Sequence, residues 1–144
     1  MPGVIYTCTK VMFAGDADWS SPSQKFGVLL ATSEYEAKKS HRHVSDVDGE
    51  LTGKGYERKV LKDRSIEANE ADGRADCHAS SVTFGKLATK EVYKWIVVYR
   101  EGANDARSDL ICAIDMGEVP LGGITEHEIR WDSQAKQGRV FSLL

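Results

Sequence analysis

The sequence predicts an all-β protein, either a sandwich or a barrel, and three observations support this. Several short runs alternate apolar and polar residues with period two. Turns rich in Gly and Asp separate these runs. Hydrophobic residues make up 41% and charged residues 28% of the 144 residues, which supplies enough apolar side chains for one core. We therefore expect one β-sandwich domain over residues 25–144, preceded by a separate segment at residues 1–24.

Residues 1–24 differ from the rest of the chain. They begin with an apolar stretch that fits a short helix or a short strand, and they end in turn-forming residues around Pro22. We predict an arm or lead-in segment that reaches a neighbouring subunit or a shell, since apolar patches are not stable as a free tail in water. The alternative is that it folds back over its own sandwich. The candidate contact residues are its large apolar side chains: Val4, Ile5, Tyr6, Val11, Met12, Phe13 and Trp19.

The residue pattern of the remaining chain predicts strands and one long loop. The expected strands span residues 25–32, 56–62, 74–84, 91–100, 109–117, 125–132 and 138–144. Residues 34–50 are polar, lack a strand period and are expected to form a long loop with at most one helical turn. The predicted core residues are Phe26, Val28, Leu30, Trp95, Val97, Tyr99, Leu110, Ile114, Ile129, Trp131, Phe141 and Leu143.

The two strands at 91–100 and 109–117 form the most informative pair. The first is apolar on both faces, which is typical of a central strand covered on both sides. One cover would be the second sheet, and the other would be the N-terminal segment or another protein. Alternation predicts that one set of side chains in each strand shares a face. The set in the first strand is Tyr93, Trp95, Val97 and Tyr99, and the set in the second strand is Leu110, Cys112, Ile114 and Met116.

No metal or cofactor site is expected. The most basic stretch, residues 38–43, carries His41 and His43 but has no suitable third ligand nearby, which favours a solvated loop over a metal or phosphate site. Residues 46–50 lack the ligand spacing of a calcium loop. The glycines of residues 53–56 resemble half of a phosphate loop, but a strand follows them, which favours a turn.

No catalytic group is expected either. The three cysteines, Cys8, Cys77 and Cys112, are widely spaced, so we expect reduced thiols rather than a disulfide framework. Cys77 and His78 are adjacent in a strand, so their side chains should point to opposite faces and form no catalytic pair.

Charge and hydropathy exclude two classes of partner. The formal net charge of −3 argues against general nucleic-acid binding. No apolar run approaches the roughly 20 residues that span a bilayer, so no membrane partner is expected. The N-terminal residues lack the features of a signal peptide, which indicates a protein synthesised in the cytoplasm.

Seven short motifs follow one another along residues 25–144: LATS (30–33), GKGY (53–56), VTF (82–84), VVY (97–99), LICAIDMG (110–117), IRWD (129–132) and GRVFSL (138–143). This order of motifs resembles a set of small virion proteins of tailed bacteriophages. Each motif alone is short, and their order and spacing carry the resemblance. Asp109 departs from it, because family members tend to have proline there. The loop at 36–43 is also unusually rich in Lys and His, and the N-terminal segment lacks a long amphipathic helix.

The resemblance implies a jelly-roll-like antiparallel β-sandwich that decorates a capsid. Such a protein would bind the outer capsid surface, stabilise contacts between major capsid subunits and form a homo-oligomer there, without enzymatic activity. The major capsid protein would be its partner, and the virion its final location after synthesis in the host cytoplasm. Two alternatives remain: a tail or fibre component that contacts host or tail proteins, and a small β-sandwich enzyme or carbohydrate-binding module.

Overall fold

The structure is a computed structural model that describes residues 3–85, 92–121, 126–131 and 137–143. All paired strands are antiparallel, which confirms the predicted all-β sandwich; its jelly-roll-like character stays a prediction. The elements in chain order are β1 (Gly3–Ile5), α1 (Thr7–Ala14), β2 (Phe26–Ala31), η1 (Val44–Asp46), β3 (Lys59–Val60), β4 (Ser65–Asn69), β5 (Arg74–Ser80), β6 (Val82–Phe84), β7 (Val92–Arg100), η2 (Asp105–Arg107), β8 (Asp109–Pro120), β9 (His127–Ile129) and β10 (Gln137–Leu143).

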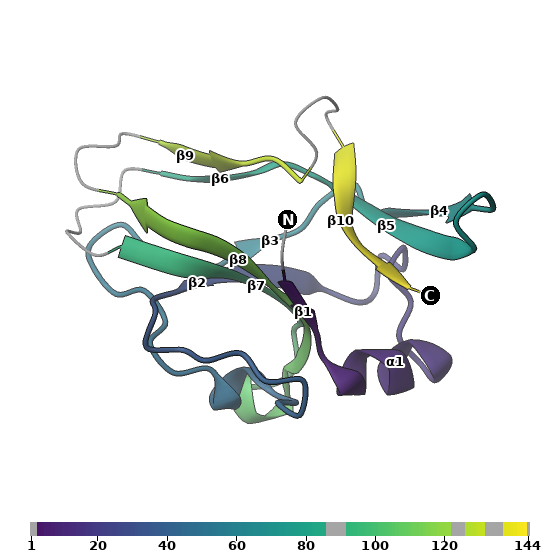
Figure 1. Ribbon diagram of the computed structural model, residues 1–144, viewed down its shortest axis with the longest axis horizontal. Helices are drawn as coiled ribbons and strands as arrows, with labels where there is room; N and C mark the ends of the chain where they lie inside the picture. Colours follow the sequence, from purple (N-terminus) through teal and green to yellow (C-terminus); the bar gives the residue numbers. More distant parts are fainter. Residues whose placement is uncertain (1–2, 86–91, 122–125, 132–136, 144) are drawn as a thin grey trace.

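One layer of the sandwich is a five-stranded sheet, here called the central sheet, with the order β1-β8-β7-β2-β3 (Figure 1). β7 is its middle strand and pairs with β2 on one side and β8 on the other. Residues 95–99 of β7 are all buried. The prediction of a central strand covered on both faces is therefore confirmed.

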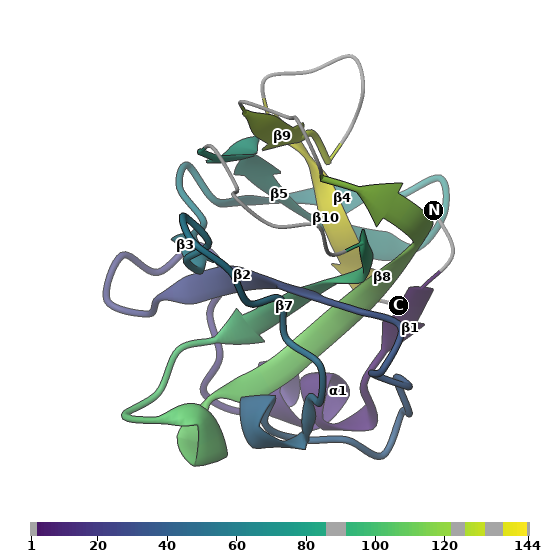
Figure 2. The same cartoon turned by 90° about the vertical axis from the view of Figure 1, so that its left-hand side faces the viewer.

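The other layer consists of two smaller sheets. One has the order β10-β5-β4 and the other pairs β6 with β9. Both lie over the same face of the central sheet, and the view from the side shows the two layers most clearly (Figure 2). The β4–β5 hairpin extends beyond one end of the central sheet (Figure 1).

The main core fills the space between the two layers, with aromatic side chains from both. Phe26 and Phe84 are almost completely buried, and Trp131 is 6% exposed. Burial of apolar area at about 25 cal/mol per Å² is the main favourable contribution to such a fold. Eleven of the twelve predicted core residues are buried; Leu143 is the exception, because it is only partly buried and packs at the edge of this core.

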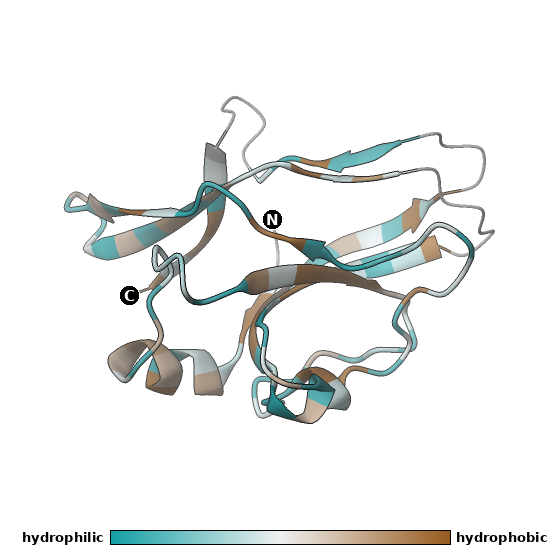
Figure 3. Ribbon diagram, turned by 180° about the vertical axis from the view of Figure 1, so that it is seen from behind, coloured by the Kyte–Doolittle hydropathy of each residue, from teal (hydrophilic) through white to brown (hydrophobic). Residues whose placement is uncertain are grey.

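A second apolar cluster lies on the opposite face of the central sheet. Trp95, Val97 and Tyr99 of β7 pack there against Tyr6 and Tyr35. Residues 32–50 cover this face, so the long polar loop supplies most of the second cover (Figure 3). The prediction named the N-terminal segment or another protein for this role; only Tyr6 and neighbouring residues of that segment take part.

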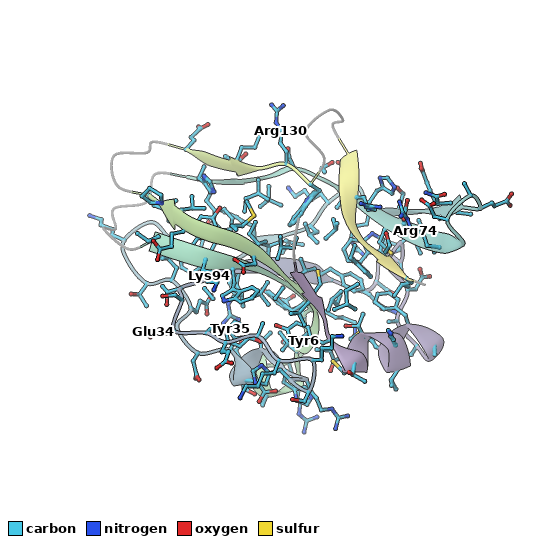
Figure 4. The ribbon with its side chains drawn as sticks, viewed as in Figure 1. Tyr6, Glu34, Tyr35, Arg74, Lys94 and Arg130 are labelled. Carbon is cyan, nitrogen blue, oxygen red and sulfur yellow. The ribbon has the colours of Figure 1, made fainter. Side chains whose placement is uncertain are left out.

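Hydrogen bonds attach the loop to this face. The hydroxyl groups of Tyr6 and Tyr35 are hydrogen-bonded at 2.6 Å, and the Trp95 indole N–H donates to the carbonyl of Tyr35 at 2.8 Å. Both tyrosines lie on the α1 side of the central sheet, opposite to Arg130 (Figure 4). Because a buried polar group without a partner is costly, these bonds allow a polar loop to pack on an apolar sheet.

Irregular pairing between β7 and β8 changes the expected side-chain phase. Pairing shifts between Tyr93 and Trp95, and Tyr93 packs in the main core while Trp95 packs on the opposite face. A second shift lies between Val98 and Tyr99, which pair with Cys112 and Leu110. Leu110 packs in the second cluster, on the opposite face of the central sheet, whereas Cys112 packs in the main core. The predicted common faces are therefore wrong for Tyr93 and for Leu110. The extra residues of both irregularities lie on β8, so a bulge explains the change at Leu110 directly.

The N-terminal segment is part of the sandwich, which corrects the prediction of an arm. β1 pairs with β8 at the edge of the central sheet. Tyr6 and Trp19 are fully buried and Met12 is 7% exposed, so these three candidate contact residues are not available to a partner. The physical reason is that the edge of β8 and one end of the main core would otherwise face water. Of the others, Val4, Ile5 and Phe13 are partly buried and Val11 is exposed.

Arg64 holds the end of this segment in place. Its guanidinium donates to the carbonyls of Trp19, Ser21 and Gln24. The same group lies over the Phe26 ring, 4.7 Å from its centroid. The boundary predicted at residue 25 is thus crossed by contacts from the sandwich, and the segment and the sandwich form one packed unit.

Several strand boundaries also differ from those expected. The strand at 56–62 is reduced to β3, because Gly53 and Gly55 have positive φ angles of 127° and 91° and turn the chain just before it. β4 was not predicted, since its Ile66 is 45% exposed and leaves no clear buried face. The 74–84 run divides into β5 and β6. The expected strand ends at residues 91, 125, 132 and 144 lie outside the described residues.

Candidate functional site

The cysteines are unsuited to nucleophilic chemistry. Burial raises the pKa of Cys77 and of Cys112 to about 12. Burial and the nearby Asp109 carboxylate raise the pKa of Cys8, against a smaller opposite effect of Arg42. A thiol is reactive as the thiolate, so raised pKa values disfavour reaction at neutral pH. Cys77 lies in the core, whereas the His78 ring lies 3.7 Å from a Glu67 carboxylate oxygen, so the two side chains form no pair.

The two loop histidines have different partners. His41 Nδ1 lies 2.9 Å from the Tyr35 hydroxyl, and the two rings stack. His43 Nε2 lies 3.7 Å from an Asp109 carboxylate oxygen. Within the described residues, no three His, Cys, Asp or Glu side chains are grouped so that they could hold a metal ion. Lys38, Lys39 and Arg42 are exposed, in line with the prediction of a solvated stretch, while Tyr35 and Val44 on either side of it pack on the central sheet.

The acidic residues of this loop serve its own turns. The backbone N–H groups of Arg42 and His43 donate to Asp46 at 2.9 and 3.1 Å, and these bonds lower the pKa of that carboxyl group. Farther along, the Tyr56 hydroxyl donates to Glu50 at 2.7 Å, and Arg58 bridges Glu50 and Asp105. These carboxylates are thus engaged with protein groups.

We expect a metal chelator to leave the thermal stability unchanged. His41, His43 and Asp46 are bonded to tyrosine, carboxylate and backbone groups, respectively, rather than arranged around a common centre. The measurement is the melting temperature by circular dichroism with and without EDTA. A drop of many degrees on chelation, reversed by one added metal, would show a metal site that these contacts do not reveal.

Two concave regions lie against β1 and α1, and a smaller third one borders residues 16 and 23–24 of the N-terminal segment. The first, here called the helix pocket, has a volume of about 500 Å³. Its walls are α1 residues 7–12, loop residues 39–43, and Arg100 and Asp109 at the facing ends of β7 and β8. In this pocket the exposed Val11 lies beside cationic side chains.

The second region, here called the strand groove, has a volume of about 780 Å³. It runs between β1 and β10, which are edge strands of the two layers. Val4 and Ile5 line one side, Arg139–Ser142 the other, and Trp131 also contributes. Of the accessible members of the predicted contact set, Val4 and Ile5 line the strand groove and Val11 lines the helix pocket, whereas Phe13 lines neither.

Sequence reasoning found only part of the helix pocket. The basic stretch 38–43 was recognised, but Thr7 and Arg100 were not associated with it, because about 60 residues of chain separate Arg100 from that stretch. The available signal was the pair of apolar residues Tyr35 and Val44 on either side of the basic stretch. Their burial draws the loop onto the sheet and brings its cations to the ends of β7 and β8.

Comparisons with known proteins add no identification: no family model, no curated protein and no solved structure matches the chain. None of the helices in the described part of the chain is long and apolar enough to cross a bilayer.

Buried phenols and thiols predict a loss of stability at alkaline pH. Burial raises the pKa of Tyr93 to about 12, and that of Cys77 and Cys112 also to about 12, from ordinary values of 10.0 and 9.0. A folded-state pKa above the unfolded value stabilises the protein below the unfolded pKa, and this contribution is lost as the pH rises through the folded pKa. The free energy of unfolding should therefore fall between about pH 9 and about pH 12.

The test is the urea midpoint measured at intervals over this range for the native chain and for Tyr93→Phe. The variant should lose less stability per pH unit above about pH 10, because it lacks one of the titrating groups. Identical slopes for the two proteins would show that Tyr93 does not titrate with a raised pKa.

Proposed function

We propose that the chain is a structural virion protein of a tailed bacteriophage, a decoration or cement protein on the outer capsid surface. The observation that carries the proposal is the order of the seven motifs over residues 25–144. Most of these motifs coincide with the framework of the fold: residues 82–84 are β6, residues 97–99 lie in β7, residues 110–117 lie in β8 and residues 138–143 lie in β10. The resemblance thus concerns positions that set the architecture.

The chemistry of the described residues supports a binding role over an enzymatic one. Their cysteines have raised pKa values, and their histidines are engaged with tyrosine or carboxylate groups. In the part of the chain that the structure describes, no buried side-chain nitrogen or oxygen lacks a hydrogen-bond partner. A preorganised catalytic site usually contains polar groups that bind the substrate rather than other protein groups, whereas a rigid scaffold needs no such groups.

The attachment surface in this proposal is the side of the sandwich around β1 and α1. Residues of the N-terminal segment remain accessible there and line both concave regions, although the segment itself is folded. The major capsid protein is the proposed partner, with self-association on the capsid around the same lattice contacts. A jelly-roll-like connectivity belongs to this proposal as well.

The test is rebinding of the purified, fluorescently labelled chain to separated heads and tails of the phage that encodes it. We expect saturable co-sedimentation with heads, at many chains per head, and none with tails. Binding to tails alone would support the tail or fibre alternative. Binding to neither, together with absence of the chain from purified virions, would contradict a virion role.

A further inference from the structure

The helix pocket concentrates positive charge in a chain whose overall formal charge is −3. Lys39, Arg42 and Arg100 line it, against the single carboxylate of Asp109. That carboxylate is already bonded to Arg100 at 2.9 Å, and Arg100 also binds Asp16 at 3.2 Å. The charge of Arg100 is thus compensated, and the uncompensated charge of the pocket resides on two loop side chains.

Lys39 and Arg42 are exposed, and no carboxylate of the described residues forms an ion pair with either. Asp46 on the same loop accepts the backbone N–H of Arg42 rather than its guanidinium. The two cations are therefore free to engage an anion from outside. An arginine is well suited to this, because its planar guanidinium can bind a carboxylate through two parallel hydrogen bonds.

Backbone hydrogen bonds fix the loop at both Lys39 and Arg42. The carbonyl of Lys39 accepts the N–H of Thr7 at 2.9 Å, and the carbonyl of Arg42 accepts the N–H of Leu110 at 2.9 Å. The loop is thereby attached to α1 on one side and to β8 on the other. An anchored backbone lowers the entropy lost when a ligand binds, since only the side chains remain to be ordered.

The floor of the pocket is apolar on the side of α1. Val11 is 71% exposed, the most exposed of the large hydrophobic residues described, and it lies next to the buried Met12. Cys8 lies one turn earlier on the same helix and also lines the pocket. An apolar side chain beside two cations fits a ligand that carries an apolar group next to a negative charge.

We propose that the helix pocket binds an acidic peptide segment of a protein partner. A carboxylate of the segment sits between Lys39 and Arg42, and an adjacent apolar side chain packs on Val11. The proposal names the chemistry of the partner and rests on the proposed function for its identity, an acidic surface segment of the capsid. A nucleic acid is a poorer fit, because the basic residues surround one pocket and do not form a stripe along a negatively charged chain.

The test is fluorescence anisotropy with the full chain and a labelled peptide of alternating Glu and Leu. The matched control peptide replaces each Glu with Gln. Arg42→Gln removes one of the two free cations, and Lys10→Gln is the matched protein control, because Lys10 is an exposed cation on α1 outside the pocket. Circular dichroism melts confirm that both variants are folded.

We expect the Glu peptide to bind more tightly than the Gln peptide, and Arg42→Gln to weaken binding about tenfold, as befits a lost charge-assisted hydrogen bond. Lys10→Gln should change the affinity less than about twofold. An equal loss of peptide affinity in Arg42→Gln and Lys10→Gln would show that only the general charge of the chain matters, and it would overturn the proposal. Absence of peptide binding to the native chain would also overturn it. Tighter binding of inorganic phosphate or of a single-stranded oligonucleotide would overturn the choice of a peptide.

The outcome is separable from that of the proposed function. Detection of the chain in purified virions depends on its location and not on the pocket. If the chain is a virion protein but the peptide does not bind, only the pocket proposal fails. If the peptide binds as expected but the chain is absent from virions, the pocket stands and its partner lies elsewhere.

Discussion

A chain that begins at Lys25 is expected to be unfolded. It lacks β1 and the fully buried side chains of Tyr6 and Trp19, and it leaves the polar groups of the β8 edge without the partners that β1 supplies. Full burial of one large apolar side chain contributes about 1.5–3 kcal/mol. The loss of several such side chains approaches the total stability of an ordinary domain, about 5–15 kcal/mol. The measurement is far-UV circular dichroism with a thermal melt.

The control for this truncation is Val11→Ser in the full chain. Val11 belongs to the same segment but is mostly exposed, so its replacement should leave the melting temperature nearly unchanged. A truncated chain that melts cooperatively near the temperature of the full chain would restore the idea of a dispensable arm. In that case the contacts of Trp19 with Arg64 and Phe26 would contribute little to the fold.

Replacement of either core tryptophan by alanine should destabilise the protein by about 3–5 kcal/mol. Trp95 is 8% exposed on the outer face of the central sheet, and Trp131 is 6% exposed in the main core. Each indole N–H also donates to a backbone carbonyl, that of Tyr35 at 2.8 Å and that of Ser80 at 3.0 Å. The alanine variants thus lose packing and a hydrogen bond together. Urea denaturation followed by circular dichroism gives the free energy of unfolding.

The matched control is Trp95→Phe, which keeps most of the apolar volume and removes only the N–H donor. Its cost should be well below that of Trp95→Ala, since packing is the larger part of the loss. Unchanged urea midpoints for both alanine variants would mean that the strand assignments around these residues are wrong. A change at Trp131 alone would instead mean that the loop at 32–50 does not cover the outer face.

The sequence was sufficient to predict the sheet but not its irregularities. β7 could be identified because nearly every residue from Tyr93 to Tyr99 is apolar or aromatic, which only a central strand accommodates. The opposite placement of Tyr93 and Trp95 coincides with a shift in pairing with β8. Such a bulge is set by the fit between two strands, and the local alternation within one strand does not encode it.

The cover over the outer face was missed for a related reason. The 34–50 stretch is polar on average, so it was predicted as a long loop, and its packing against the sheet was not predicted. Its packing depends on two side chains, Tyr35 and Val44, which are 2% and 3% exposed. Once these are buried, the hydrogen bonds of Tyr35 with Tyr6, His41 and Trp95 satisfy the polar groups that accompany them. A tertiary contact of this kind has no periodic pattern in the sequence.

For the candidate site too, the local features could be predicted from the sequence but their assembly could not. The basic stretch 38–43 was visible in the sequence, and so was the apolar character of Val11. Their meeting with Arg100 and Asp109 in one pocket requires the pairing of β7 with β8 and the packing of α1 against the loop. Long-range contacts therefore assemble the site from segments that look unrelated along the chain.

Copy number per purified virion tests the central claim most directly. Quantitative mass spectrometry of particles, with isotope-labelled peptides of this chain and of the major capsid protein, gives the ratio of the two. A decoration protein predicts hundreds of copies, in a simple ratio to the capsid lattice. A handful of copies would place the chain in the tail, and its absence from purified particles would contradict a structural virion role altogether.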